Sequence, residues 1–194
     1  MASYRAIAGI LNALKEQLEA RMVGGLDAVV EAPTVKLLGT HQLNDAPSGN
    51  ALGLYLHRMS VDPFGRNRYL PGNTPDQPRQ PELPINLHLL MIGWSDKATN
   101  EGTLLGWGMQ QIGASLDLDI SHLGVADDDW GEGEKVQLQP EEMSTEDLLR
   151  IWEGLPRDYL LSAPYLIKTL RLQPEPKVES GPPVQTIVTP MEVR

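Results

Sequence analysis

The chain has 194 residues, of which 41% are hydrophobic, and it carries a formal net charge of -10 with a pI near 4.8. This length and hydrophobic content predict one domain with one good core. The negative charge argues against a nucleic-acid partner, because phosphate backbones are bound by a local surplus of lysine and arginine, and no basic run occurs. Cysteine is absent, which excludes disulfides and thiolate metal sites and fits assembly in a reducing cytoplasm. No apolar run is long enough to span a bilayer and no secretion signal precedes the domain, so we expect a soluble, unprocessed chain.

An amphipathic helix is predicted at the N-terminus, from about Ser3 to Met22. Ser3 is the expected cap, and Gly24 and Gly25 are expected to end the helix, because paired glycines favour the left-handed geometry found there. Apolar residues recur at spacings of three and four, which is the pattern of one buried stripe. The stripe consists of Ile7, Leu11, Leu14, Leu18 and Met22.

Short strands are predicted over residues 27–32 and 35–38, on either side of Pro33, which suits the edge of a sheet. Two stronger strands, over 52–59 and 83–92, alternate between two apolar faces, so we expect both faces of the sheet to be covered. In the first strand, Leu52, Leu54 and Leu56 lie opposite Tyr55, His57 and Met59. In the second strand, Ile85, Leu87, Leu89 and Met91 lie opposite Asn86, His88, Leu90 and Ile92.

A second helix is predicted over residues 100–116, capped by Thr99 or Asn100, with a buried stripe of Leu105, Met109, Ile112 and Leu116. Its glycines weaken an isolated helix by up to ~1 kcal/mol each, so we expect close packing of this helix to compensate. These glycines are Gly102, Gly106, Gly108 and Gly113.

The remaining pattern predicts a strand over 135–139, a short helix that starts at Ser144, and a final strand over 165–172. The apolar side of the short helix is expected to comprise Leu148, Leu149, Ile151, Trp152 and Leu155. The expected fold is therefore α/β (α+β), a single domain over 1–172 with a central mixed or antiparallel sheet and packed helices. A Pro-rich, extended tail follows over 173–194.

The segment 62–82 joins the two strong strands and is rich in proline, glycine and asparagine, so it cannot bury enough apolar surface to fold by itself. Long loops inside a compact domain are usually functional, and this one carries residue types enriched at binding hot spots. A solvated loop without a role is the alternative. The hypothesis for the interface comprises Arg58, Phe64, Arg66, Asn67, Arg68, Tyr69 and Arg79.

An enzymatic site would depend on the four histidines, His41, His57, His88 and His122, which titrate near neutral pH. His57 and His88 lie on neighbouring strands and could face each other. No His-x-x-x-His pair or carboxylate-rich ligand loop accompanies them. We therefore expect hydrogen-bonded histidines of the core or of an interface, with no catalytic residue, metal or cofactor.

Four ordered blocks follow the N-terminal helix: LGLYLHRMSVDPFGRNRYLPG, PELPINLHLLMIGWSDKATNEGTLLGWGMQQI, STEDLLRIWEGLP and DYLLSAPYLIKTLRL. In this order they resemble the Pvc16 N-terminal domain family, over nearly the whole chain up to about Leu172. That family contains cap or tube-terminator proteins of extracellular contractile injection systems. The resemblance implies a structural protein without enzymatic activity, usually hexameric, that becomes a component of a phage-tail-like particle after cytoplasmic assembly. The partners it implies are the inner tube protein, the sheath protein and possibly a second cap protein.

The end of an open tube exposes the surface that accepts the next ring, so growth stops when a protein binds that end without offering the surface again. The segment 184–189, with Ile187 and Val188 at its centre, could add a strand to the exposed sheet edge of a neighbour, and an unstructured end is the alternative. An assembly chaperone or adaptor for tube or sheath subunits is the second functional hypothesis, and a metal-dependent enzyme is the third.

Overall fold

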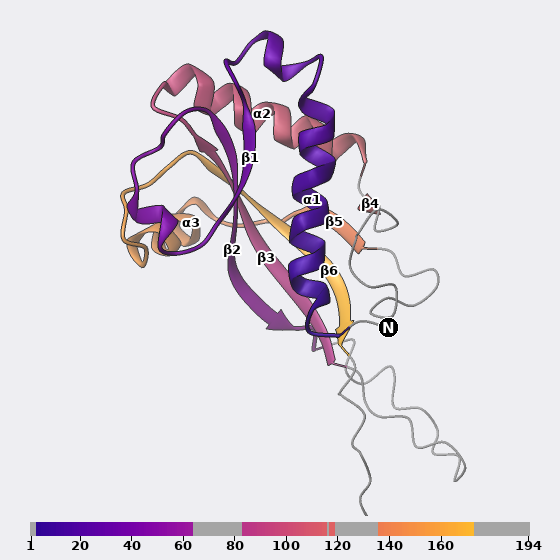
Figure 1. Ribbon diagram of the computed structural model, residues 1–194. Helices are drawn as coiled ribbons and strands as arrows, with labels where there is room; N and C mark the ends of the chain where they lie inside the picture. The colour runs from indigo at the N-terminus through magenta and orange to yellow at the C-terminus, as the bar shows by residue number, and fades with distance from the viewer. Residues whose placement is uncertain (1–2, 64–82, 116, 119–135, 173–194) are drawn as a thin grey trace, which may run out of the picture.

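The computed structural model describes residues 3–63, 83–115, 117–118 and 136–172 (Figure 1). A six-stranded sheet runs through this part of the chain in the order β1-β2-β3-β6-β5-β4. β1 is parallel to β2, and the other neighbours are antiparallel, so the α/β (α+β) prediction holds with a mixed sheet. The strands are β1 (Thr34–Leu38), β2 (Ala51–Val61), β3 (Leu83–Trp94), β4 (Asp117–Leu118), β5 (Val136–Pro140) and β6 (Ser162–Leu172).

Two helices cover one face of the sheet, and a third helix with a loop covers part of the other. α1 (Ala6–Met22) and α2 (Ala98–Ala114) pack on the first face, as the sequence predicts, and α3 (Thr145–Glu153) lies on the opposite side (Figure 1). The strand alternation places Leu52, Leu87 and Leu89 in the first core, and Tyr55 and Leu90 in the second. Both faces of β2 and β3 are therefore buried over part of their length, as their apolar runs predict.

α1 begins three residues later than predicted. The residue before it is Arg5, which makes no side-chain cap, and the Ser3 hydroxyl accepts a hydrogen bond from the Arg5 N–H (3.2 Å). The buried stripe of α1 is centred one residue away from the predicted one, because Ile10 is fully buried while Ile7 and Leu11 are only partly so.

The strand predicted over 27–32 is wrong. Residues Leu26–Ala28 form a 3-10 turn, η1, and Val29 is exposed; the buried apolar side chains of this region are Leu26, just before the predicted strand, and Val30. Both are buried against the core around α1, and their spacing of four is that of a helical turn and not of strand alternation. The second prediction in this region is confirmed, since β1 directly follows Pro33 and is an edge strand.

α2 lies unusually close to the sheet at two glycines. A Cβ on Gly93 of β3 would lie 2.5 Å from the Glu101 carbonyl oxygen, and one on Gly108 would lie 2.5 Å from Met91 Sδ. Close packing therefore explains Gly108 among the four helix glycines. The others face open space and are not explained in this way: Gly102, Gly106 and Gly113.

Three details of α2 differ from the prediction. The helix begins at Ala98 after Lys97, so Thr99 and Asn100 lie inside its first turn and do not cap it. Leu104 is fully buried, whereas Met109 is 46% exposed, because the glycine contact at Gly108 sets the face that meets the sheet. Leu116 lies outside the described residues.

α3 begins as predicted. The Ser144 side chain accepts a hydrogen bond from the Asp147 N–H (3.1 Å), which satisfies one free donor of the first turn. Trp152 is buried under this helix, and its indole N–H donates to Ser162 Oγ (3.0 Å). Leu149, predicted on the apolar side, is exposed, and β6 begins at Ser162, three residues before the predicted start.

Candidate functional site

Of the interface residues predicted from the sequence, Arg58 is the one that falls in the described part of the chain. It lies on β2, near the end from which the 62–82 segment leaves the sheet. The remaining candidates lie outside the described residues: Phe64, Arg66, Asn67, Arg68, Tyr69, Arg79, Ile187 and Val188.

A bulge in β2 places Arg58 beside a group of polar side chains. The pairing of β2 with β3 shifts between Leu56 and Arg58, so that Arg58 lies opposite His88 and Ser60 lies opposite Asn86. A bulge re-aims the side chains that follow it. Arg58 and Ser60 thereby come to the same face as His88, beyond the part that α3 covers.

His88 is the centre of this polar cluster, which we define as His57, Arg58, Ser60, His88 and Glu141. Its Nδ1 lies 2.8 Å from Glu141 Oε1, and its Nε2 lies 2.7 Å from Ser60 Oγ. Because a carboxylate only accepts hydrogen bonds, Nδ1–H donates to Glu141 and Nε2 accepts the Ser60 hydroxyl proton. The side chains of His88 and Glu141 are 6% and 14% exposed. Such a buried pair is stabilising only when its hydrogen bonds are made.

Arg58 closes the polar cluster on its outer side. Its Nη2 lies 3.1 Å from Nδ1 and 3.4 Å from Nε2 of the His88 ring, and 3.6 Å from Glu141 Oε1. More than half of the Arg58 side chain is exposed. The guanidinium therefore offers donors to solvent or to a partner while its inner edge meets the Glu141 carboxylate.

His57 packs edge-on against His88, with the ring centroids 5.9 Å apart, so the two histidines face each other as the sequence suggested. Burial lowers the pKa of His57 to about 4; the nearby charge of Glu141 opposes this shift, and His88 and Arg58 add to it. His57 is therefore neutral at neutral pH. Two buried atoms of the polar cluster, His57 Nε2 and Glu141 Oε2, have no hydrogen-bond partner.

The Ser60–His88–Glu141 chain has the connectivity of a nucleophile, a base and an orienting carboxylate. Catalysis also requires room for a substrate beside the hydroxyl and donors aimed at a developing oxyanion. Here Arg58 lies against the imidazole, and Ser60 pairs with Asn86 inside the β2–β3 ladder. These contacts tie the bulge of β2 to β3 and to Glu141.

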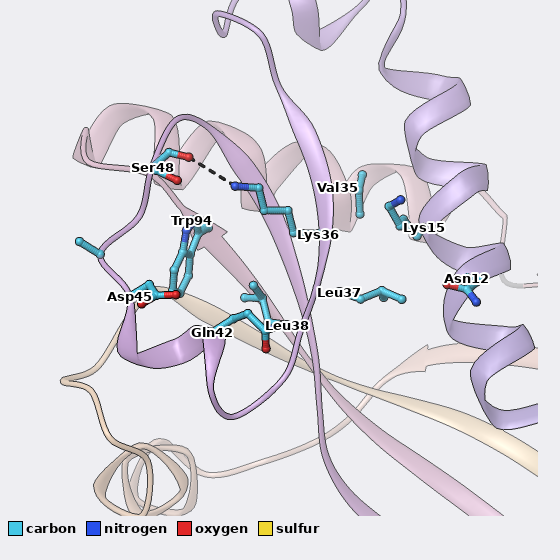
Figure 2. Close-up of a pocket in the computed structure, with 11 residues that line it drawn as sticks. Asn12, Lys15, Val35, Lys36, Leu37, Leu38, Gln42, Asp45, Ser48 and Trp94 are labelled. Atoms are coloured by element: carbon cyan, nitrogen blue, oxygen red, sulfur yellow. Dashed lines mark hydrogen bonds between the residues drawn. The ribbon is translucent and has the colours of Figure 1, made fainter.

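A groove of about 440 Å³ lies along the free edge of β1 (Figure 2). Asn12 and Lys15 of α1 form one wall, and the loop 39–50, which contains the 3-10 turn η2 (Gln42–Asn44), forms the other. On the strand between the walls, Lys36 points toward the loop and donates to the Ser48 carbonyl (3.4 Å). The groove therefore straddles an edge strand and is open to solvent.

The described residues hold neither a metal-binding cluster nor a membrane-spanning helix. No group of three or more histidine, aspartate or glutamate side chains is arranged to hold a metal ion in the described ranges. Within those same ranges, no helix has the length and apolarity needed to cross a membrane.

Sequence reasoning missed Ser60, Glu141 and the β1 groove as parts of a site. Glu141 is distant in the chain from His88 and meets it because its N–H donates to the Pro164 carbonyl (3.0 Å), beside β6. The sequence signal that could have indicated Glu141 is its place directly after the short strand β5. For the groove, the signal was Pro33 before a strand that carries Lys36, since proline and lysine mark sheet edges.

Comparison with known proteins identifies the family. The model of the Pvc16 N-terminal domain matches residues 9–186. The sheath/tube terminator of PVC, an extracellular contractile injection system, in its extended state has a TM-score of 0.58 and 14% identity, over 97% of this chain and 64% of that one. The tube-terminating cap of the anti-feeding prophage has a TM-score of 0.58 and 17% identity, over 94% of this chain and 60% of that one. This chain thus spans less than two thirds of the length of either structure, and no curated protein matches it. The chain belongs to the Pvc16 N-terminal domain family.

Proposed function

We propose that this chain is a structural cap of a contractile injection system, and that it forms a hexameric ring on the end of the inner tube, the sheath or both. The observation that carries the proposal is the family match over residues 9–186, together with a fold shared over nearly the whole chain with two terminators. Assembly in the cytoplasm, the inner tube and sheath proteins as partners, and a second cap protein are parts of the same proposal.

The mechanism is steric. A subunit that binds the last ring on one side and offers no equivalent surface on the other ends a heterologous polymer. The polar cluster supports such a role, because its hydrogen bonds tie the bulge of β2 to β3 and Glu141, a few residues before the 62–82 segment, while Arg58 stays exposed. The candidate contact residues of that segment, Phe64 to Arg79, lie outside the described residues, and their contact with the last ring is part of the proposal.

The test is the length of particles assembled without this chain. In an assembling system that lacks it, electron microscopy is expected to show tubes or sheaths of uncontrolled length or with frayed ends. Particles of normal length with intact ends would contradict the proposal.

An assembly chaperone or adaptor is the second hypothesis, and native mass separates it from the cap. A cap is expected as a stable ring or as a component of finished particles. A monomer or dimer that is absent from purified particles would favour the chaperone.

Hydrolase activity is tested on the hydrogen-bonded chain at Ser60. A fluorophosphonate probe labels serines activated by a histidine, and we expect no labelling of the native protein. Labelling that disappears in Ser60→Ala would instead establish an enzymatic activity.

A further inference from the structure

The edge of β1 offers unpaired backbone groups. The Thr34 N–H donates to the Asn50 carbonyl (3.1 Å), so Thr34 faces β2. Backbone groups of successive residues point to opposite sides of a strand, so those of Val35 and Leu37 point outward. In the described part of the sheet, no strand lies on that side.

The groove along this edge is held open by its own side-chain contacts. The Asn50 Oδ1 accepts from Ser95 Oγ (2.8 Å) and from Asn100 Nδ2 (2.9 Å), and its Nδ2 donates to the Glu31 carbonyl (2.8 Å). In the middle of the loop 39–50, directly after η2, Arg157 donates to the Asp45 carbonyl. A groove preformed in this way loses little entropy when an extended chain enters it.

The walls decide what kind of ligand fits. Val35 and Leu37 pack toward α1, and Leu38 packs toward the loop, so a strand added outside β1 would lie between two covered surfaces. The groove is too open for a small molecule to be enclosed, whereas main-chain pairing along an edge gives affinity to an extended peptide. Lys36 on the edge discourages indiscriminate pairing.

The chain itself carries a suitable peptide in residues 184–189, Val-Gln-Thr-Ile-Val-Thr, which is uncharged and rich in β-branched residues. β6 ends at Leu172, which pairs with Leu83 at the start of β3, whereas β1 pairs with the start of β2. The tail therefore leaves the sheet at the end away from the groove of its own chain. The stretch from 172 to 184 can span at most roughly 40 Å.

We propose that residues 184–189 of one subunit add a strand to β1 of the next subunit, in the groove between α1 and the loop 39–50. The proposal rests on the cap function, because a closed ring lets every subunit donate one strand and receive one. It names the contact that links the subunits, which the cap function alone leaves open.

The test uses the absence of cysteine from the chain. Lys36→Cys is mixed under oxidising conditions with single-cysteine variants at Gln185, Thr186, Ile187 or Val188, in full-length protein under ring-forming conditions. A covalent dimer is expected with those tail positions that lie on the Lys36 side of the added strand, and denaturing gels show it as a doubling of mass. The matched control replaces Lys36→Cys with Arg150→Cys, on the exposed face of α3, and should give no dimer.

Three outcomes would overturn the proposal: no dimer at any tail position, equal dimer with the Arg150 control, or cross-linking only within one chain when Lys36→Cys and a tail cysteine are combined. A second variant, Ile187→Pro, removes a backbone donor from the tail without touching the described domain. It should convert the ring to monomers at unchanged circular dichroism. An intact ring in Ile187→Pro would refute strand addition and leave the cap function standing, whereas a wild-type chain that forms no ring and is absent from particle ends would refute the cap function.

Discussion

The two faces of the sheet are covered in different ways. On one face, α1 and α2 cover the strands, and α2 approaches so closely that Gly93 and Gly108 have no room for a Cβ. On the other, α3 and the loop 39–50 cover one end, and the polar cluster takes the place of an apolar cover at the other. The first face is a core alone, whereas the second joins a core to the base of the segment that we propose contacts a partner.

The difference shows why the same strands carry both leucines and histidines. Tyr55 and Leu90 lie under α3, while Arg58 and His88 lie further along the same two strands, where no helix of the described residues covers them. A polar side chain there is tolerated because its hydrogen bonds are made within the polar cluster.

The largest loss of stability is expected from a substitution in α3, where this helix covers the second core. Trp152→Ala removes a side chain that is 2% exposed and a buried hydrogen bond to Ser162, so a loss of about 3–5 kcal/mol of unfolding free energy is expected. Urea titration measures it, and Leu149→Ala, on the exposed side of the same helix, is the control with a small effect. Equal losses in the two variants would show that α3 is not the cover of this core.

Because α2 packs so closely on the sheet, a glycine-to-alanine substitution is expected to destabilise the protein at Gly93 and to stabilise it at Gly106. Gly93→Ala places a Cβ 2.5 Å from a helix carbonyl oxygen, and overpacking of this kind costs about 1–3 kcal/mol. Gly106→Ala meets nothing within 4 Å and should stabilise the helix by up to about 1 kcal/mol. Thermal unfolding of both variants tests the pair. Destabilisation by Gly106→Ala would indicate that this helix face packs against something in the protein.

The polar cluster should contribute less than the hydrophobic core to the free energy of unfolding. Glu141→Ala removes the acceptor of the His88 Nδ1–H and leaves that donor buried, which costs about 1–3 kcal/mol. The neighbouring Glu142→Ala is the matched control, because this side chain is exposed and should change stability by less than about 0.5 kcal/mol. If both variants unfold alike, the polar cluster does not stabilise the base of the 62–82 segment.

The smallest expected effect is on the pH dependence of the unfolding free energy. Burial lowers the pKa of folded His57 to about 4 from its ordinary value of 6.5, so the unfolded state binds more protons between these values. The contribution of His57 is fully present above about pH 6.5 and is lost as pH falls toward 4. His57→Gln should therefore flatten the pH dependence of unfolding free energy in this window, as measured by urea titrations from pH 7 to pH 4.5. An unchanged slope would show that His57 is not desolvated.

Much of the fold could be predicted because periodicity reports burial directly. The faces of β2 and β3, the Ser144 cap and the edge position of β1 follow from local pattern alone. The η1 turn could not be told from a strand, because the apolar residues within 27–32 form one short run, and the helical spacing appears only when Leu26, just before it, is paired with Val30. Met109 was misplaced because the close contact at Gly108 sets the rotation of α2 on the sheet, and helix periodicity does not report that contact.

The polar cluster could be predicted only in part. Neighbouring strands bring His57 and His88 together, which sequence order indicates. Glu141 lies near them because its N–H donates to the carbonyl of Pro164 in β6, a contact between residues distant in the sequence. The bulge at His57 also cannot be predicted from a pattern in which side chains alternate strictly between the two faces of a strand. The interface residues predicted in 64–82 and 184–189 stay predictions.

The central claim is that this chain sits at the end of a tube, and its position in finished particles tests it most directly. Because the chain has no cysteine, Arg150→Cys labelled with maleimide gold before assembly marks this protein alone, at an exposed position on α3. The account predicts gold clustered at one end of each particle in electron micrographs. Gold distributed along the tube or sheath, or absent from the particles, would contradict it.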